Sequence, residues 1–189
     1  FMNSKFSHFI LNVLNPTMSY QVGNLKSLPL KFPKQDYTKQ QIDSLTQQNI
    51  DISKEEWDSR ETSWDFTKNE LLKHKSDSKI ETAYNNYCSY WKEKFYKLHA
   101  NEEELNRLFI DIYEVGDELT PDVALKDITI LKSESIINDN NELEFKADEI
   151  MKQFISYAVG VMFGRYSIDS VGLVVANLNK DYPKDTTFE

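Results

Sequence analysis

Cysteine, glycine and proline are scarce in this sequence. Its 189 residues include one cysteine, Cys88, five glycines and five prolines. A single cysteine cannot form an internal disulfide and makes a cysteine-based zinc site implausible, so a reducing compartment fits and a cytoplasmic location is predicted. None of the glycines forms G-x-G-x-x-G or a phosphate-binding loop, so no cofactor-binding residue is assigned. The small number of helix-breaking residues and the 40% of hydrophobic residues are typical of a folded chain that can form helices.

Long hydrophobic runs are also missing. The first sixteen residues, FMNSKFSHFILNVLNP, contain a short apolar run that Ser7, His8 and Asn12 interrupt. This run is too short to span a bilayer and has no signal-peptide cleavage pattern. No membrane partner is therefore expected.

Clusters of residues that could carry out chemistry are not apparent either. His8, His74 and His99 are far apart and show no metal-ligand spacing, so no metal site is predicted. The acidic run 102–104 could supply a general acid and base, but it fits the solvated start of a helix better. No catalytic residue is assigned.

Charge is unevenly distributed along the chain. Residues 1–40 carry five lysines and one aspartate, a net charge of +4, whereas the remaining residues carry 17 basic and 30 acidic groups, a net charge of −13. Only the N-terminal part is therefore suited to lie beside a polyanion. Ordinary solvated surface is an equally open interpretation, because a +4 segment without arginine is a weak nucleic-acid footprint.

Apolar residues at steps of three and four predict a mainly α fold with a few short strands. The first predicted helix starts with the chain itself, without a capping residue, as if the chain began inside a domain, and ends at Asn15-Pro16. Residues 18–33 predict a short strand and an extended connection. A second helix is expected from about Thr38, with a possible break near Ser53.

The strongest periodicity lies further along the chain. Residues 80–98 predict one helix, and a cap at Asn101 followed by a stripe that ends at Gly116 predicts a neighbouring second helix. Another helix is expected over 147–164 and should be deeply buried, with Gly160 and Gly164, four residues apart, allowing close backbone approach. The aromatic residues of the first stripe are interpreted as core rather than as a base-stacking platform; they are Tyr84, Tyr87, Tyr90, Trp91 and Phe95.

The remaining segments give weaker patterns. Residues 58–78 predict a packed loop near three apolar anchors, Trp57, Trp64 and Phe66. The run DITIL, residues 127–131, predicts a short strand, and SIINDNNELEF, residues 135–145, a loop or hairpin. The tail, residues 172–189, contains one possible strand.

Several phrases of the sequence resemble a known family. The stretch FMNSKFSHFILNVLNPTMSYQVGNLKSLPLKFPKQDYTKQQIDSL resembles the closing part of target-recognition domains in restriction-modification systems. The phrases EWDSRETSWDF, NEEELNRLFIDIYEVGDELTPDV and ISYAVGVMFGRYSIDSVGL are similar to the C-terminal region beyond the catalytic domain of BREX-type (PglX-like) adenine-specific DNA methyltransferases. Together these similarities cover most of the chain.

The resemblance implies a parent protein that uses S-adenosylmethionine to methylate adenine N6 within a specific site of double-stranded DNA, marking host DNA in phage defence. Such enzymes need an Asn-Pro-Pro-Tyr element, but the one Asn-Pro pair here, Asn15-Pro16, is followed by Thr17. No catalytic residue can therefore be transferred to this chain, and the cofactor is expected in the parent protein.

These observations combine into one interpretation of the chain. Residues 1–35 are expected to form the end of a DNA target-recognition domain, and residues 36–189 a mainly helical bundle or spacer that positions this domain or docks defence-system partner subunits. The side chains expected nearest DNA are Lys5, Lys26, Lys31 and Lys34. The alternative is a stand-alone helical adaptor that binds proteins, because an acidic helical body can present grooves to partners.

Overall fold

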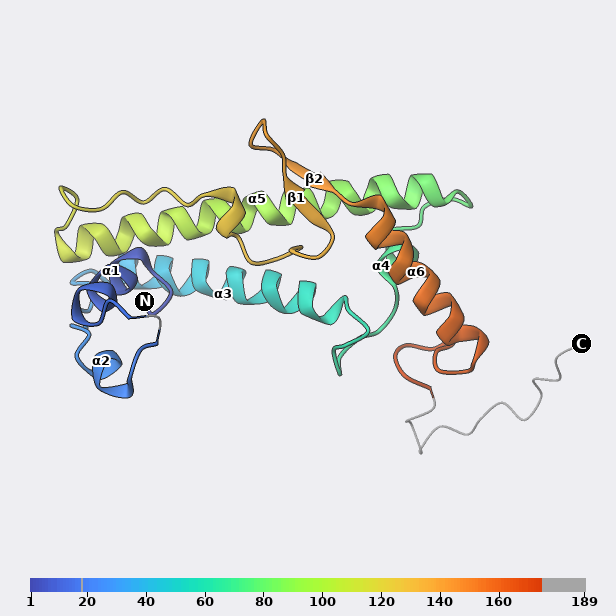
Figure 1. The fold of residues 1–189 in the computed structure, drawn as a ribbon, viewed down its shortest axis with the longest axis horizontal. Helices are drawn as coiled ribbons and strands as arrows, with labels where there is room; N and C mark the ends of the chain where they lie inside the picture. Colours follow the sequence, from blue (N-terminus) through green and yellow to red (C-terminus); the bar gives the residue numbers. More distant parts are fainter. Residues whose placement is uncertain (18, 175–189) are drawn as a thin grey trace, which may run out of the picture. The chain divides into compact units, whose positions relative to one another are not determined.

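The computed structural model describes residues 1–17 and 19–174 and is mainly helical, which confirms the predicted fold class (Figure 1). The one sheet in this part of the chain has two short antiparallel strands. In chain order the elements are α1 (Lys5–Leu14), α2 (Val22–Lys26), α3 (Asp36–Asp58), α4 (Glu70–Lys73), α5 (Ile80–Tyr113), a 3-10 helix (Leu125–Asp127), β1 (Ser135–Ile137), β2 (Leu143–Phe145) and α6 (Ala147–Met162).

The chain divides into two compact units. Among the described residues, the first unit comprises residues 1–54, 91–130 and 137–143, and the second comprises residues 55–90, 131–136 and 144–174. Both long helices, α3 and α5, contribute to the two units. Among the residues that the structure describes, no helix is long and apolar enough to cross a membrane.

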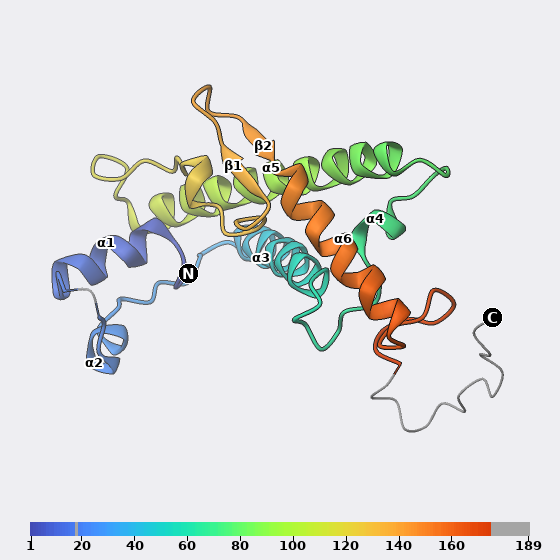
Figure 2. The same cartoon turned by 45° about the vertical axis from the view of Figure 1, so that its right-hand side comes forward.

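An antiparallel pair of helices forms the centre of the first unit. The α3 and α5 ribbons run side by side in both views (Figures 1 and 2). Gln41 near the start of α3 donates to Glu104 at 3.1 Å, and Asn101 donates to Asn49 at 2.8 Å. Helix α3 contributes the buried Ile52. Helix α5 contributes larger buried side chains, as its apolar stripe predicts: Trp91, Phe95 and Leu98.

The N-terminal segment packs on the end of α5. The Phe6 ring stacks on Tyr113 with centroids 3.7 Å apart, and the Lys5 backbone N–H donates to the Asn106 side chain at 2.9 Å. After α5 the chain returns along this helix, where Asn106 also donates to the Pro121 carbonyl at 3.2 Å. Asn106 therefore joins α1 and the returning loop to α5.

The second unit is built around α6 and the short segments that precede it. Phe66, Tyr157 and Tyr166 form an aromatic cluster in which the two tyrosine rings stack at 5.0 Å. A β-carbon at Gly160 would lie 2.7 Å from the Tyr166 ring, so the close approach expected there is confirmed. The same expectation for Gly164 is wrong, because nothing lies within 4 Å of a β-carbon at that position. The hairpin expected over residues 135–145 is also confirmed, because β1 and β2 pair there.

Two expectations near the N-terminus are wrong. The first helix does not start with the chain, because α1 begins at Lys5 after Ser4, whose side chain accepts from the Ser7 N–H. The strand expected within residues 18–33 is instead the short helix α2. Gln21 and Asn24 cap its N-terminus with reciprocal side-chain hydrogen bonds. Local capping therefore outweighs the β-branched and proline signals in this segment.

Three helix boundaries also differ from the sequence pattern. Helix α3 passes through Ser53 without a break, because Ser53 is exposed and does not interrupt the buried face. Helix α5 is one element rather than two, because Asn101 is buried and binds α3 instead of capping a new helix. Helix α5 ends before Gly116, at Tyr113, and Glu114 takes the left-handed conformation at φ 58°.

Several burial expectations fail as well. Trp57 and Trp64 are exposed, so Phe66 alone anchors the loop that follows α3. The run DITIL is not a strand; Ile128 and Ile130 are buried without pairing. Helix α6 is not deeply buried: Ile150, Tyr157 and Gly160 are buried on one side, whereas Ile155 and Met162 are exposed. Within the described residues Leu173 makes one isolated antiparallel bridge, to Tyr166, and most of the tail in which a strand is possible lies outside them.

Candidate nucleic-acid interface

All four candidate lysines lie in the first unit, but the structure does not gather them into one patch. Lys5 is half-buried in the first turn of α1, and Lys26 is exposed in the last turn of α2. Lys31 and Lys34 are exposed on the extended segment that leads to α3. Only the last two come together, because they line the same hollow of about 280 Å³.

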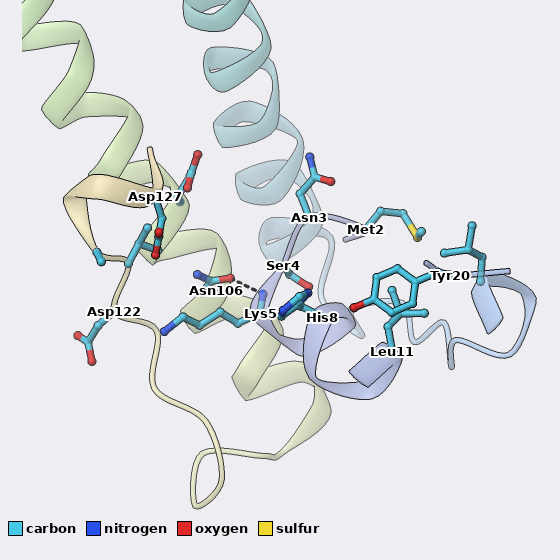
Figure 3. A pocket seen from close by; sticks show the side chains of 14 residues that line it. Met2, Asn3, Ser4, Lys5, His8, Leu11, Tyr20, Asn106, Asp122 and Asp127 are labelled. Atoms are coloured by element: carbon cyan, nitrogen blue, oxygen red, sulfur yellow. Dashed lines mark hydrogen bonds between the residues drawn. The ribbon is translucent and has the colours of Figure 1, made fainter. Parts of the chain in front are cut away.

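Lys5 lines a larger hollow of about 920 Å³ together with His8, Asp122 and Asp127 (Figure 3). The Lys5 side chain extends toward the side of this hollow that carries the two aspartates. A carboxylate near a cation lowers the positive potential available to a phosphate. Lys5 is consequently a weaker phosphate contact than an isolated exposed lysine.

Glu102 lines the same hollow and is partly buried. Burial raises the pKa of the Glu102 carboxyl; His99 opposes this shift and the negative charge of Asp127 adds to it. His99 also donates to the Val123 carbonyl at 2.7 Å, which fixes the returning loop on α5. This hollow therefore combines mixed charges on a surface held by local hydrogen bonds.

Lys31 has a nearby counter-charge. Its ammonium lies 3.6 Å from Glu114, and both side chains are exposed, so the pair is weak and screened by salt. The Lys31 backbone is held more firmly, because its N–H donates to the Tyr113 hydroxyl at 2.8 Å, and this hydroxyl donates to the Pro29 carbonyl at 2.6 Å. The extended segment is thus anchored while the lysine side chains point to solvent.

The aromatic stripe of α5 does not form a stacking platform. Tyr87, Trp91 and Phe95 are buried, and Tyr84 and Tyr90 are partly buried. Core packing, as the helical spacing predicts, is confirmed for the three buried rings. Burial, with a hydrogen bond to Cys88, raises the pKa of Tyr84 to about 12.

A buried polar network in the second unit was not predicted from the sequence. Glu134, whose side chain is 1% exposed, receives two bonds of 2.5 Å from the Arg60 guanidinium. It also accepts from Tyr87 at 2.5 Å and from Gln153 at 2.8 Å. Arg60 in turn donates to Glu56 at 2.5 Å. The network ties together the end of α3, α5, the start of the hairpin and α6.

Electrostatics within this network favour the ion pair. Burial alone lowers the pKa of Arg60, but the hydrogen bond and charge of Glu134, with those of Glu56, outweigh burial and raise it. Burial and the negative charge of Glu134 raise the pKa of Tyr87. Every polar partner inside the network is satisfied, so it serves structure rather than ligand binding. The residues of this network are far apart in the sequence, and no local motif predicts the network.

Comparison with known proteins gives a consistent relation over the whole chain. It is 40% identical over 192 residues to the adenine-specific methyltransferase PglX of Lacticaseibacillus casei (strain Zhang), and the alignment covers 100% of this chain and 15% of that protein. The chain is homologous to one part of such methyltransferases. It is also 30% identical over 180 residues to the adenine-specific methyltransferase BrxX of Escherichia coli O9:H4 (strain HS), across 93% of this chain and 14% of that protein.

The chain spans about one seventh of the length of these curated relatives. No protein-family model matches it. Among the described residues there is no group of three or more histidine, cysteine, aspartate or glutamate side chains that could hold a metal ion.

Proposed function

We propose that this chain is a non-catalytic, C-terminal segment of a BREX-type adenine-specific DNA methyltransferase that acts in restriction-modification and phage defence in the cytoplasm. The observation that carries the proposal is the similarity of the whole chain to a small share of PglX and BrxX. The role of the segment in the parent protein is to position DNA target recognition or to dock partner subunits.

The residues of this chain do not fit a cofactor site of its own. S-adenosylmethionine, the methyl donor of the proposed parent, requires a glycine-rich loop, and adenine methylation requires an Asn-Pro-Pro-Tyr element. Neither is present in the 189 residues. Catalysis and cofactor binding are therefore assigned to the parent protein outside this chain.

A positioning role agrees with the structure of the first unit. A methyltransferase that acts on a base must flip it out of the duplex while other parts of the protein hold the phosphates and read the base edges. Residues 1–35 complete the target-recognition domain in this proposal, and the helices of residues 36–189 form the spacer. The bonds of Lys5 and Lys31 to α5 residues give the lysine-bearing segment a fixed support.

The lysines can be tested by DNA binding of the full-length protein. Replacing Lys26, Lys31 and Lys34 with alanine should weaken binding to double-stranded DNA. The slope of log K against log salt should fall by about 0.9 for each phosphate that a lysine no longer neutralises, so by up to about 2.7. The matched control replaces three exposed lysines outside the basic segment, Lys75, Lys79 and Lys92. An equal effect of both triple variants would remove DNA binding by these lysines from the proposal.

Glu114 offers a second test of the same interface. If Lys31 meets a phosphate, Glu114→Gln should raise DNA affinity, because the competing carboxylate 3.6 Å away loses its charge. The gain should shrink as salt increases, since both side chains are exposed. An affinity that does not change in Glu114→Gln at low salt would take Lys31 out of the interface.

The positioning role is tested by separating cofactor binding from methyl transfer. The full-length protein and a version that lacks this segment should bind S-adenosylmethionine equally, whereas only the full-length protein should transfer label to adenine at specific sites. Loss of cofactor binding on deletion would instead show that the segment supports the catalytic domain itself.

A further inference from the structure

The extended segment before α3 and the end of α5 form a small hollow within the first unit. Residues 31–35 and Thr38 line it from one segment, and Leu108, Asp111, Ile112 and Glu114 line it from the other. Its volume of about 280 Å³ lies near the lower limit for ligand pockets, which is about 300 Å³. The hollow therefore suits one small ring system rather than a large ligand.

Apolar side chains from both segments line this hollow. Phe32 and Pro33 come from the extended segment, and Leu108 and Ile112 come from α5. The Phe32 side chain is 72% exposed, but its backbone is restricted, because Pro33 follows it and the N–H of Lys31 donates to the Tyr113 hydroxyl at 2.8 Å. The backbone that carries the ring is thus fixed while the ring stays open to solvent, which suits stacking on a planar ligand.

Polar groups at the same hollow match the edge of a nucleobase. The Gln35 amide offers both a donor and an acceptor, and the Asp111 carboxylate offers acceptors; both side chains are exposed. A glutamine amide can pair with a donor and an acceptor on one base edge, and a carboxylate accepts from an exocyclic amine. The hollow is therefore complementary to a base that carries such an amine.

Charge in the hollow is balanced. Lys31 and Lys34 line it together with two acids, Asp111 and Glu114. A balanced interior suits a neutral ring better than a free anion, whereas exposed lysines can contact the phosphates that flank a base. The pair of Lys31 with Glu114 at 3.6 Å is exposed and weak, so Lys31 can exchange this partner for a phosphate.

Two other exposed aromatic rings lie among acids instead. Trp57 stands between Glu56 and Asp58 in the sequence, and Trp64 is followed by Asp65. Carboxylates beside a ring repel the phosphates of a nucleic acid, and sites that stack single bases combine aromatic rings with basic residues. The position of Phe32 between Lys31 and Lys34 meets this requirement.

We propose that this hollow binds a single unpaired nucleobase with an exocyclic amine, as part of a nucleic acid. Phe32 stacks on the base, Gln35 and Asp111 bond to its edge, and Lys31 and Lys34 contact the neighbouring phosphates. This inference rests on the proposed function in that the parent protein binds DNA, and it adds a base contact to the phosphate contacts of the basic segment.

Duplex DNA with one extrahelical base tests the site in the full-length protein. Fluorescence anisotropy compares three duplexes: one with an extrahelical cytosine, one with an extrahelical thymine, which is of similar size but has no exocyclic amine, and one that is fully paired. The wild type should bind the cytosine duplex about tenfold more tightly than the thymine duplex. A pocket for adenine elsewhere in the protein would not produce this difference.

Substitutions at the hollow should remove the preference. Phe32→Ala should weaken binding of the cytosine duplex about tenfold, because a stacked ring is lost, and should leave the fully paired duplex unchanged. Asp111→Ala should bring the affinities for the cytosine and thymine duplexes close to each other. The matched control is Trp64→Ala, which removes an exposed ring among acids and should change none of the three affinities.

Three results would overturn the base site: equal wild-type affinity for the cytosine and thymine duplexes, a preference that survives Phe32→Ala and Asp111→Ala, or cytidine monophosphate that binds as tightly as the cytosine duplex. The last result would assign a free nucleotide instead. The phosphate contacts fail separately, because they are measured on the fully paired duplex. If the triple lysine variant weakens that duplex while Phe32→Ala has no effect on any duplex, the phosphate contacts stand and the base site does not.

Discussion

Glu134→Gln should strongly destabilise the second unit, because it disrupts the buried polar network around this carboxylate. The carboxylate is 1% exposed and accepts from three side chains: Arg60, Tyr87 and Gln153. A glutamine amide replaces one acceptor oxygen with a donor, so at least one of these donors faces another donor. Loss of one partner from a buried ion pair costs about 3–5 kcal/mol, and we expect about 3 kcal/mol because Arg60 keeps its bond to Glu56.

This loss should be visible in thermal unfolding of the 189-residue chain. For a chain of this size about 3 kcal/mol corresponds to a decrease in Tm of about 6–12 °C. The matched control is Glu114→Gln, which removes the same charge from the exposed pair with Lys31 and should change stability by less than about 0.5 kcal/mol. Calorimetry that gives the two variants the same Tm would refute the assignment of Glu134 as the structural centre of the second unit.

Three further predictions concern other positions. Gly160→Ala should destabilise the protein by about 1–3 kcal/mol in urea unfolding, because the new methyl group meets the buried Tyr166 ring. The control is Gly23→Ala, which has open space around it and should be neutral or slightly stabilising. Equal effects of the two substitutions would contradict the packing of Gly160 against Tyr166. Burial raises the pKa of Glu102, so the folded state prefers the protonated carboxyl and the wild type loses stability as pH rises through the raised value. The Tm of Glu102→Gln should therefore rise relative to that of the wild type between about pH 4 and pH 7. A Tm difference that stays constant over this range would count against the buried carboxyl. Burial also raises the pKa of Cys88, so its alkylation at about pH 8 should be slower in the folded chain than in urea, and equal rates would show an open thiol.

Periodicity predicted the helices well because each buried stripe is a local property of the sequence. Tyr87, Trp91 and Phe95 recur at steps of four, and any helix over them presents one apolar side. The boundaries were harder to predict. Asn101 followed by Glu104 has the pattern of a helix cap, yet Asn101 binds Asn49 of α3, and only the tertiary pairing shows this.

Burial of α6 was overestimated for a related reason. Its sequence is apolar on two sides, and a helix of that composition is expected inside a domain. Phe163 and Met162 are instead exposed, because the described residues supply neighbours for only one side. Sequence alone cannot tell a side that packs within the chain from one that packs elsewhere.

The candidate lysines show a similar limit. Net charge over residues 1–40 locates the basic segment, but it does not reveal that Lys5 shares a hollow with Asp122 and Asp127 or that Glu114 lies beside Lys31. These acids follow the long helix α5 and are far from the lysines in sequence. Sequence composition therefore identified a basic segment, whereas the fold shows how much of its charge is offset.

The positioning role can be tested in bacteria by mapping N6-methyladenine in their DNA, with the full-length gene and with the same gene lacking this segment. We predict that sequence-specific methylation disappears on deletion while the truncated protein remains abundant and still binds S-adenosylmethionine. Methylation that persists at the same sites and to the same extent without the segment would contradict its role in positioning target recognition.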